Sequence, residues 1–489
     1  MKKIAVIGAG VSGMTAAIYC LKSGFDVSVF EKHSISGGVC TSWTRKGYTF
    51  EGAVHWLSDS AETDPLYRLW RDTGILAEGV QTRRNDPYFV YRYAGKDICL
   101  YRDVEKLKAH FLEIAPEDAQ AIHRLYGDIR SMGHLHMPVL DIGGLKTKNP
   151  SRMKLSALFR MTGALLRMGR FSKLSAVEYA AAFKHPGIKK LLSEFVIMGE
   201  YGSMSLLATL AALACSGVFP EGGSLALAKR MEDKIRALGG KITFNAKVEK
   251  IIVEQGAAKG IVVNGEPLFF DGVIVTQDAI AAQALFDNPP KDKWLQEMQN
   301  QKPAQCTFAG IGVHADLSGL PYFFAIDERI SVGGIAYDSL AFNNYATHSG
   351  YAPGGCTALT ASFTGDSYDY WDNLRKSGGY DEQKRLLAAG LTRIIEKHLP
   401  KTAGKIEVVN IATPLTYERY TGSCRGAWMT FMDKHSKPAM PEPIAKDINN
   451  LYFAGFRTIV PGGLPVALYS GFRAAQYACR DNGLVFEGG

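Results

Sequence analysis

Residues 4–13 read IAVIGAGVSG, an apolar run that passes directly into the pattern Gly-x-Gly-x-x-Gly. Residues 14–21 are small or apolar and predict a helix, and residues 27–30 predict a second strand that ends at Glu31. Strand, glycine loop, helix, strand and terminal carboxylate follow one another as in a dinucleotide-binding βαβ unit. A glycine-rich turn without a ligand is the alternative, and the complete βαβ context favours the dinucleotide.

Each glycine of the loop has its own physical role in this prediction. Gly8 permits the tight turn, Gly10 lets the backbone approach a pyrophosphate, and Gly13 lets helix and strand pack closely. The following helix offers free N–H groups and the positive end of its dipole to the phosphates. Glu31 is expected to accept hydrogen bonds from the hydroxyls of the adenosine ribose.

The composition is that of an ordinary globular protein. Its 489 residues exceed what one simple core holds, so we expect two domains. The net charge of +8 is modest, and the eight cysteines are scattered without a Cys-x-x-Cys pair. They predict reduced, mostly buried thiols and no disulfide framework. No spacing typical of metal ligands or of a serine nucleophile occurs, so we predict no metal site.

Two segments could be mistaken for targeting or membrane signals. Two lysines precede the first apolar run, but glycines interrupt that run, so we predict no signal peptide. Residues 206–219 are largely apolar, yet they contain polar residues and are too short to span a bilayer. They predict a buried helix, and no segment of the sequence qualifies as a transmembrane helix.

The order of expected strands and helices predicts an α/β fold with two interwoven domains. A Rossmann-like dinucleotide-binding domain is expected from residues 1–75, 206–287 and 411–489. An α+β substrate domain is expected from residues 76–205, where the spacing is mostly helical, and from residues 288–410. Within the latter we expect strands at 307–313 and 357–363 and a helix over 381–398.

Five landmarks of the chain occur in the order found in one family of flavoproteins. They are Gly8-x-Gly10-x-x-Gly13 with Glu31, then Gly37-Gly38, Pro220-x-Gly222-Gly223, Gly239-Gly240-x-Ile242 with Val248, and Ala454-Gly455 with Pro461-Gly462-Gly463. The chain thereby resembles the carotenoid desaturases, carotenoid isomerases and retinol saturases, which are close to the amine oxidases. The resemblance implies FAD as the cofactor and a Rossmann-like FAD-binding domain of the amine oxidase and phytoene desaturase type.

The resemblance also implies which residues bind FAD. Glu31 resembles the residue that binds the ribose, and Val248 resembles the position whose backbone meets the adenine. Gly462 and Gly463 would let the final helix direct its N-terminus at the flavin, where the dipole stabilises negative charge on the reduced ring. The implied FAD-binding set is Gly8, Gly10, Val11, Ser12, Gly13, Glu31, Lys32, Gly37, Gly38, Val39, His55, Val248, Thr276, Gly455, Gly463, Leu464 and Pro465.

Three positions depart from the common family pattern. Val39 stands where many relatives have an arginine that reaches the pyrophosphate, and Phe456-Arg457 follows the C-terminal Ala-Gly. His55-Trp56 resembles a histidine–aromatic pair of retinol saturases more than it resembles the desaturase pattern. These choices favour the saturase and isomerase branches.

Two residues are predicted to be catalytic. His55 follows a strand expected near the flavin and could act as general acid or base, because its ordinary pKa lies near neutrality. The alternative for His55 is a histidine that only hydrogen-bonds in the core. Arg457 could contact the pyrophosphate or stabilise anionic flavin, and a plain surface ion pair is its alternative. Trp56, Tyr420 and Trp428 could line a tunnel for a lipid, or simply belong to the core.

The resemblance implies an oxidoreductase that acts on carbon–carbon bonds of a hydrophobic, isoprenoid or polyene-like substrate by hydride transfer at flavin N5. Desaturation, saturation and isomerisation all remain open. The alternatives are a flavin amine oxidase, for which an aromatic cage and a lysine near N5 are expected, and a flavin-binding membrane protein without turnover. No second nucleotide fingerprint occurs, because Gly310-Ile311-Gly312 continues into a strand. We therefore expect an external electron donor or acceptor: a quinone, oxygen or another reductant.

Residues 142–177 contain eight lysines and arginines and no acidic residue, and Arg160, Arg167 and Arg170 are among them. Apolar residues are interleaved at helical spacing. A basic amphipathic helix of this kind suits an anionic membrane surface, so we expect a cytoplasmic protein held peripherally on the inner face of a membrane. A basic helix face packed on the substrate domain is the alternative, and nothing else in the sequence supports nucleic-acid binding.

Overall fold

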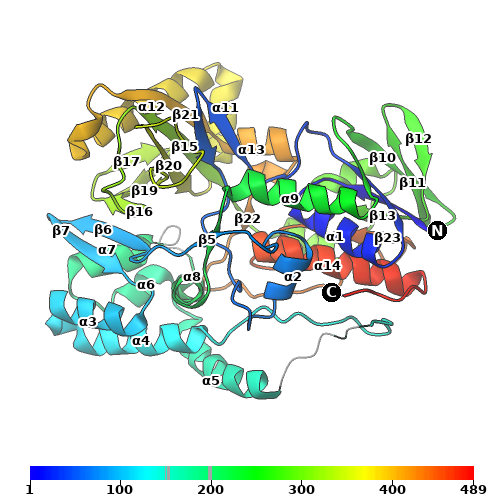
Figure 1. Cartoon of the computed structure of the whole chain (residues 1–489), viewed down its shortest axis with the longest axis horizontal. Helices are drawn as coiled ribbons and strands as arrows, with labels where there is room; N and C mark the ends of the chain where they lie inside the picture. Colours follow the sequence, from blue (N-terminus) through cyan, green and yellow to red (C-terminus); the bar gives the residue numbers. More distant parts are fainter. Residues whose placement is uncertain (149, 151–154, 196–200, 489) are drawn as a thin grey trace.

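The computed structural model describes residues 1–148, 150, 155–195 and 201–488, and its parts form two interwoven domains with a helical layer beneath the second (Figure 1). Five parallel strands form the sheet of the nucleotide domain, in the order β23-β13-β1-β2-β9. Their bounds are β1 Lys3–Ile7, β2 Asp26–Phe30, β9 Lys241–Thr243, β13 Gly272–Val275 and β23 Leu451–Phe453. The sheet is thus assembled from distant parts of the chain.

Both faces of this sheet are covered, which explains the unbroken apolar run of β1. Ile4 and Val6 face a core shared with α1 Val11–Lys22, α9 Gly223–Ala237 and α14 Leu464–Asp481. Ala5 and Ile7 face a second core on the opposite side. That side is formed by a three-stranded sheet of β10 Val248–Glu254, β11 Ala257–Val263 and β12 Glu266–Phe269, with α10 Lys293–Gln299.

The second domain is built on a seven-stranded sheet in the order β21-β15-β20-β19-β16-β6-β7. Its strands are β6 Phe89–Tyr93, β7 Lys96–Leu100, β15 Cys306–Val313, β16 Phe323–Ile326, β19 Leu340–Asn344, β20 Thr357–Thr364 and β21 Ile406–Ala412. Two helices, α11 Tyr368–Ser377 and α12 Tyr380–His398, cover one face. The strands and helix expected between residues 307 and 398 are confirmed.

The prediction of helical spacing for residues 76–205 is incomplete, because β6 and β7 come from that segment. The two strands form an antiparallel hairpin whose turn is Ala94-Gly95, both with positive φ. Five-residue strands are too short to impose a visible period on a longer window, so the helical spacing of the following residues dominated the prediction.

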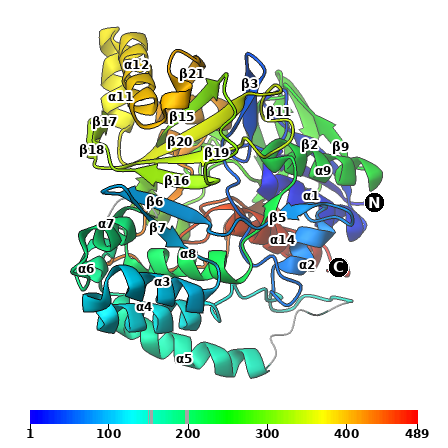
Figure 2. The same ribbon diagram turned by 60° about the vertical axis from the view of Figure 1, so that its left-hand side comes forward.

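The helical layer packs beneath β6, β7 and β16 and shares one core with them (Figure 2). Its helices are α3 Val104–Ile114, α4 Ala119–Met132, α5 Leu155–Phe171, α6 Ala176–Ala180, α7 Pro186–Glu194 and α8 Ser203–Cys215. The predicted buried helix is α8, which ends just before Gly217. Among the helices of the described residues, none is long and apolar enough to cross a membrane.

Short elements complete the chain. They are α2 Tyr67–Asp72 and α13 Pro414–Thr421, with strands β3 Ser42–Arg45, β4 Tyr48–Glu51, β5 Thr82–Arg83, β8 Phe219–Pro220, β14 Pro303–Ala304, β17 Ile330–Val332, β18 Ile335–Tyr337 and β22 Met429–Thr430. The β4 strand lies against the large sheet, where a Cβ on Gly310 would come within 2.3 Å of the Phe50 ring. The Gly310-Ile311-Gly312 run is therefore a place of close packing and carries no nucleotide loop.

A buried carboxylate joins the two domains. Glu51, at the end of β4, accepts hydrogen bonds from the backbone N–H of Ser224 at 2.9 Å and from the Tyr351 hydroxyl at 3.0 Å, and it also bonds the Ser224 hydroxyl. A Cβ on Gly223 would lie 2.0 Å from a Glu51 oxygen, so only glycine fits there. The Pro220-x-Gly222-Gly223 landmark thus makes room for an interdomain junction.

Candidate active site

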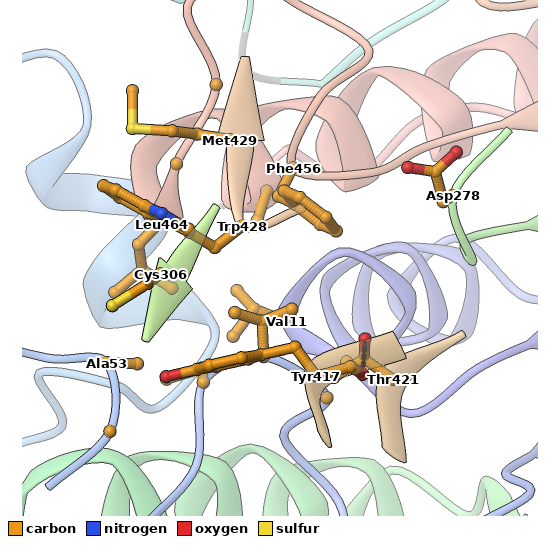
Figure 3. Close-up of a pocket in the computed structure, with 18 of the residues that line it drawn as sticks. Val11, Ala53, Asp278, Cys306, Tyr417, Thr421, Trp428, Met429, Phe456 and Leu464 are labelled. Atoms are coloured by element: carbon orange, nitrogen blue, oxygen red, sulfur yellow. Dashed lines mark hydrogen bonds between the residues drawn. The ribbon is translucent and has the colours of Figure 1, made fainter. Parts of the chain in front are cut away.

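A single cavity of about 1250 Å³ runs from the glycine loop of the nucleotide domain into the second domain. Figure 3 shows its middle, with Val11 and Tyr417 on one side and Trp428, Phe456 and Leu464 on the other. The space therefore lies between the start of α1, the start of α14 and the segment from α13 to β22.

The glycine loop at one end has the geometry that its sequence predicts. Gly8 has φ +104°, and a Cβ on Gly13 would lie 2.0 Å from the Gly8 carbonyl oxygen. The α1 helix begins after Gly10 without a side-chain cap and without an acidic residue in its first turn. Its first N–H groups are therefore left for an anion in the cavity, as a pyrophosphate requires.

The second glycine pair packs directly onto this loop. The N–H of Gly37 donates to the Ala9 carbonyl at 2.8 Å, and Gly37 and Gly38 have φ +118° and +62°. A Cβ on Gly37 would lie 2.3 Å from the Cys40 carbonyl oxygen. Backbone alone thus forms this wall of the cavity, and Val39 lines it beside the pair.

Glu31 is buried at the end of β2 and lines the cavity. Its two oxygens accept from the N–H groups of Ala9 and His33, each at 2.8 Å. Each carboxylate oxygen keeps a further lone pair, which a ribose hydroxyl can use. The neighbouring Lys32 donates to the Arg419 carbonyl at 3.0 Å, and partial burial lowers the pKa of its ammonium group.

The α14 helix presents a second uncapped N-terminus to the middle of the cavity. Gly462 and Gly463 have φ +106° and +92°, Pro465 occupies the first turn, and no side chain caps the helix. Two buried polar atoms that line the same space have no partner, the Trp428 indole nitrogen and the Tyr201 hydroxyl. One long cavity thus contains two uncapped helix N-termini, walls of glycine backbone and a carboxylate that can accept hydrogen bonds from a ribose. These features fit FAD.

Most residues of the implied FAD-binding set line the cavity. They are Gly8, Gly10, Val11, Ser12, Glu31, Lys32, Gly37, Gly38, Val39, His55, Val248, Thr276, Gly463, Leu464 and Pro465. Gly13 and Gly455 do not line it. Gly13 serves the helix–strand contact, and the N–H of Gly455 donates to the Ser470 hydroxyl at 3.0 Å. Contact between Gly455 and the cofactor is therefore not supported.

Arg457 does not line the cavity either, which argues against its predicted contact with flavin or pyrophosphate. Its guanidinium forms an ion pair with Asp278 at 2.7 Å, and both side chains are almost fully buried. The pair is therefore not the surface ion pair considered as the alternative. Asp278 does line the cavity, so Arg457 acts by holding that carboxylate in place.

His55 and Trp56 both line the cavity. Burial lowers the pKa of His55 to about 4, and its Nδ1 atom has no hydrogen-bond partner. The imidazole is therefore neutral at neutral pH, which weakens the acid half of the predicted general acid or base role and leaves the base half open. Its participation in catalysis stays a prediction.

The three aromatic residues expected to line a tunnel, Trp56, Tyr420 and Trp428, all border the cavity. Sequence reasoning missed most of the other end, which is formed by side chains from the second domain. They include Phe195, Ser205, Ala208, Thr209, Ala212, Phe323, Ala341 and Asn343. The α8 residues recur at helical spacing, a signal that fits one cavity-facing stripe and equally fits a packed helix.

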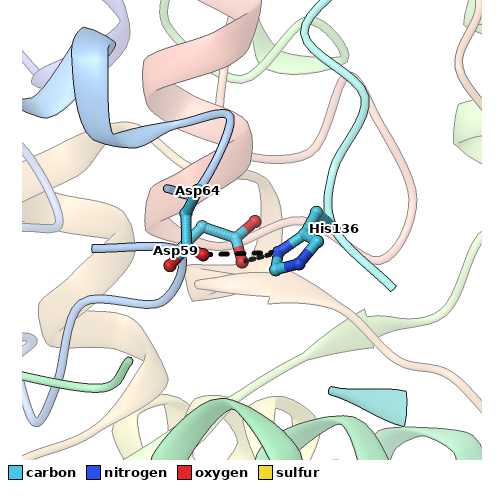
Figure 4. Close-up of side chains that lie close together, drawn as sticks. All are labelled: Asp59, Asp64 and His136. Atoms are coloured by element: carbon cyan, nitrogen blue, oxygen red, sulfur yellow. Dashed lines mark hydrogen bonds and ion pairs between the residues drawn. The ribbon is translucent and has the colours of Figure 1, made fainter. Parts of the chain in front are cut away.

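The structure also gathers three side chains whose sequence spacing gave no signal (Figure 4). Asp59, Asp64 and His136 bring potential metal-ligand atoms within 4.8 Å of one another. The His136 Nδ1 atom lies 3.0 Å from an Asp59 oxygen and 3.9 Å from an Asp64 oxygen. A hydrogen bond between the His136 ring and the Asp59 carboxylate, with Asp64 close by, accounts for these distances.

The fold and the site together are those of an FAD-dependent oxidoreductase. The cavity joins the dinucleotide site at the start of α1 to a further space in the second domain, and the two parts meet at the start of α14. The family model described as flavin containing amine oxidoreductase matches residues 11–479. The chain belongs to the family of flavin-containing amine oxidoreductases, and FAD is its cofactor.

Carotenoid enzymes are among its curated relatives. The prolycopene isomerase of Daucus carota is 23% identical, over 98% of this chain and 80% of that protein. The 4,4'-diapophytoene desaturase of Methylomonas sp is 25% identical, over 99% of this chain and 97% of that protein. Cyclohexylamine oxidase from Brevibacterium oxydans has a similar fold, with a TM-score of 0.61, 14% identity and 99% of each chain covered. The predicted family and fold are confirmed.

Proposed function

We propose that this oxidoreductase acts on a carbon–carbon bond of a hydrophobic, polyene-like substrate, by desaturation, saturation or isomerisation. The observation that carries the proposal is the continuation of the cavity beyond the dinucleotide region into a space lined by Phe195, Ala208 and Phe323. Bound FAD would supply two-electron chemistry where the two parts of the cavity meet. The names of the carotenoid isomerase and desaturase relatives support a substrate of this class.

The amine oxidase alternative receives less support from the cavity lining. Of the residues described, the only lysines that line the cavity are Lys32 and Lys247. Both belong to the dinucleotide end, beside Glu31 and Val248 respectively, so neither occupies the place of a lysine near flavin N5.

An anaerobic titration of the FAD-loaded protein tests the proposal. Oxidised and dithionite-reduced protein are each mixed with prolycopene, 4,4'-diapophytoene or cyclohexylamine, and the flavin spectrum is recorded. Mass spectrometry and chromatography then show which polyene gains or loses two hydrogens or changes its double-bond geometry. A response to a polyene supports the proposal, and a response to the amine alone supports the amine oxidase. A protein that responds to none of them would be a flavin-binding protein without turnover.

We also propose that the protein works peripherally on the cytoplasmic face of a membrane, with α5 toward the lipid. Leu165 and Leu166 on this helix are 52% and 83% exposed, and Val177 on α6 is both exposed and part of the cavity wall. An apolar substrate could thus pass from lipid to the cavity near α6. The arrangement suits a shallowly inserted helix surface with basic residues around it.

Two of the arginines expected to contact lipid have a structural partner. Arg170 and Arg167 lie 2.5 and 3.7 Å from a carboxylate oxygen of Asp128, whose side chain is fully buried. Arg160 lies where only the backbone is described. A lipid-binding test should therefore leave Arg167 and Arg170 intact. Their replacement would leave the buried Asp128 carboxylate without a partner and so would destabilise the fold.

The test uses the double variant Leu166→Asp, Lys173→Glu and vesicles with or without phosphatidylglycerol. Co-sedimentation with the anionic vesicles should fall, while Leu386→Asp should leave it unchanged. Leu386 is 55% exposed on α12, at the opposite end of the molecule in Figures 1 and 2. Equal binding by all three proteins would refute the assignment of this surface.

The proposed reaction needs an external electron partner unless it is an isomerisation. We propose a quinone, oxygen or another small reductant or oxidant. Stopped-flow mixing of the reduced protein with oxygen or with a water-soluble quinone measures which of them reoxidises the flavin at a useful rate.

A further inference from the structure

A small side chamber of about 20 Å³ adjoins the main cavity. His55, Trp56, Phe323 and Asn343 line both spaces and so form the wall between them. The other residues of the chamber are Arg83, Asn85, Tyr88, Arg102, Leu213, Phe219 and Tyr322. A volume of this size holds one water molecule, provided that polar partners are present.

Three polar atoms of the chamber residues are buried without a hydrogen-bond partner. They are Nδ1 of His55, the hydroxyl of Tyr322, which lies close to the Tyr345 and Asn343 side chains, and Nδ2 of Asn343. The Asn343 residue is only 6% exposed. Leaving such atoms without a partner is destabilising, and a buried water typically makes about three hydrogen bonds to groups of this kind.

The lining of the chamber is positively charged. It is lined by the guanidinium-bearing residues Arg83 and Arg102, and none of its described lining residues is a carboxylate. Asp86 lies outside the lining and accepts a hydrogen bond from the backbone N–H of Arg102 at 2.9 Å. A water molecule in such surroundings is stabilised as it gives up a proton and destabilised as it gains one.

We propose that this chamber binds one water molecule through Asn343, Tyr322 and His55, and that the water replaces protons that His55 gives to the main cavity. Asn343 Nδ2 can only donate, so it donates to the water oxygen, and the water donates to Nδ1 of His55. His55 then carries its proton on Nε2, the nitrogen left for the main cavity. Asn343 and Tyr322 are positioning residues in this arrangement.

The proton transfer balances without a charged imidazole. The Nε2–H bond breaks as the substrate carbon next to the hydride-accepting carbon takes the proton, and an Nδ1–H bond forms as the water O–H bond breaks. The resulting hydroxide is stabilised by the arginines and recovers a proton from solvent on the exposed Arg83 side. Return of the Nδ1 proton to the chamber and uptake of a proton at Nε2 from water in the emptied main cavity then restore the starting tautomer. Burial disfavours the imidazolium ion of His55, but it does not penalise an exchange between two neutral tautomers.

This inference rests on the proposed function and refines it. Saturation needs a proton delivered to the substrate, whereas desaturation must remove one. The relay delivers a proton in the direction needed for saturation, and the same relay run in reverse removes the proton that desaturation must lose.

Two measurements on the FAD-loaded protein without substrate test the chamber. A crystal structure that resolves waters should show one within hydrogen-bonding distance of the three orphan atoms. NMR of ¹⁵N-histidine-labelled protein, with the His55 signals assigned by comparison with His55→Asn, should show an unprotonated Nδ1. An empty chamber, or a His55 protonated at Nδ1, would overturn the proposal even if polyene turnover is established.

The variant Tyr322→Phe should shift the His55 signals toward a mixture of tautomers and lower the rate of deuterium uptake from D2O into a reduced polyene product. Tyr452→Phe is the matched control, because the Tyr452 hydroxyl is also buried without a partner but lies on β23. Unchanged His55 signals in Tyr322→Phe would contradict the role of the chamber water. If Tyr322→Phe does not fold, the crystal structure and the NMR spectrum of the unaltered protein still test whether the chamber holds the proposed water.

Discussion

The two ends of the cavity are built in different ways. At the dinucleotide end, backbone forms the walls: glycines with positive φ at positions 8, 37, 38, 462 and 463, and the free starts of α1 and α14. At the substrate end, side chains of α8, β16 and β19 form the walls. A wall made of backbone requires glycine at fixed positions and is therefore visible as a sequence motif. A wall made of side chains can be formed by many different apolar residues and therefore has no sequence motif.

Gly10→Val should break the dinucleotide end outright. A Cβ on Gly10 has ordinary contacts, 3.8 Å from the Gly37 carbonyl oxygen, but the methyl groups of valine would occupy the space of the pyrophosphate. We expect FAD content to fall to background, measured as flavin absorbance per protein. Gly390→Val is the control, because nothing lies within 4 Å of that Cβ position on α12. A fully loaded yellow variant would refute the assignment.

Ala208→Phe should block substrate binding at the substrate end and leave FAD binding at the dinucleotide end unchanged. Ala208 is exposed within the cavity on a helix whose leucines are buried, so phenylalanine would fill the space proposed for the substrate. We expect polyene turnover to fall about 100-fold, equivalent to ~2.7 kcal/mol of transition-state stabilisation, with unchanged FAD content. Ala389→Phe, on the surface of α12, should change neither quantity. Loss of FAD from Ala208→Phe would contradict the assignment of separate dinucleotide and substrate ends to the cavity.

Acid should destabilise the folded protein through His55 and His348, whose imidazoles are both shielded from water. Burial lowers the pKa of both His55 and His348 to about 4, so the unfolded chain binds more protons between pH 6.5 and 4. Stability is therefore highest above pH 6.5 and falls as the pH decreases to 4, by ~1.4 kcal/mol per pH unit for each histidine.

His348→Phe should remove one of these contributions. Both ring nitrogens of His348 are buried without a partner, so phenylalanine loses no hydrogen bond. Urea unfolding at pH 7.5 and pH 5 should show a smaller acid loss in the variant, by about 1–2 kcal/mol. An identical pH dependence in both proteins would show that His348 does not titrate in this window.

Glu31→Gln should have the smallest effect. The amide keeps one acceptor oxygen, but it loses the charge-assisted bond to the ribose, so FAD affinity should fall about 10-fold, or ~1.4 kcal/mol. Quenching of FAD fluorescence on binding to the apoprotein measures this change. Affinity equal to that of the unaltered protein would mean that Glu31 only holds the Ala9 and His33 backbone.

The sequence was sufficient where local geometry demands particular residues. The glycine loop and the start of α14 were predictable, because positive φ and close backbone approach restrict those positions to glycine. Glu31 was predictable because a carboxylate at the end of the second strand belongs to the same dinucleotide pattern. Arg457 was misjudged because its partner, Asp278, is 179 residues away. The His136–Asp59 contact, at a separation of 77 residues, and the Glu51–Tyr351 contact, at 300, were hidden for the same reason.

The substrate end was unpredictable for a different physical reason. The helical stripe of α8 and the strands β16 and β19 satisfy the same apolar pattern whether they face a core or a cavity. Only the placement of Asn343 beside Tyr322 and His55 marks this region as more than packing, and those residues come from three separate parts of the chain.

The packing of α14 against α1 has a consequence for the order of events during synthesis. A Cβ on Gly471 would lie 2.3 Å from the Ser12 carbonyl oxygen, so the two helices meet backbone to backbone. The surroundings of the glycine loop at residues 8–13 are completed only by a helix that begins at Leu464. Chains stalled on the ribosome before residue 464 should therefore hold no tightly bound flavin.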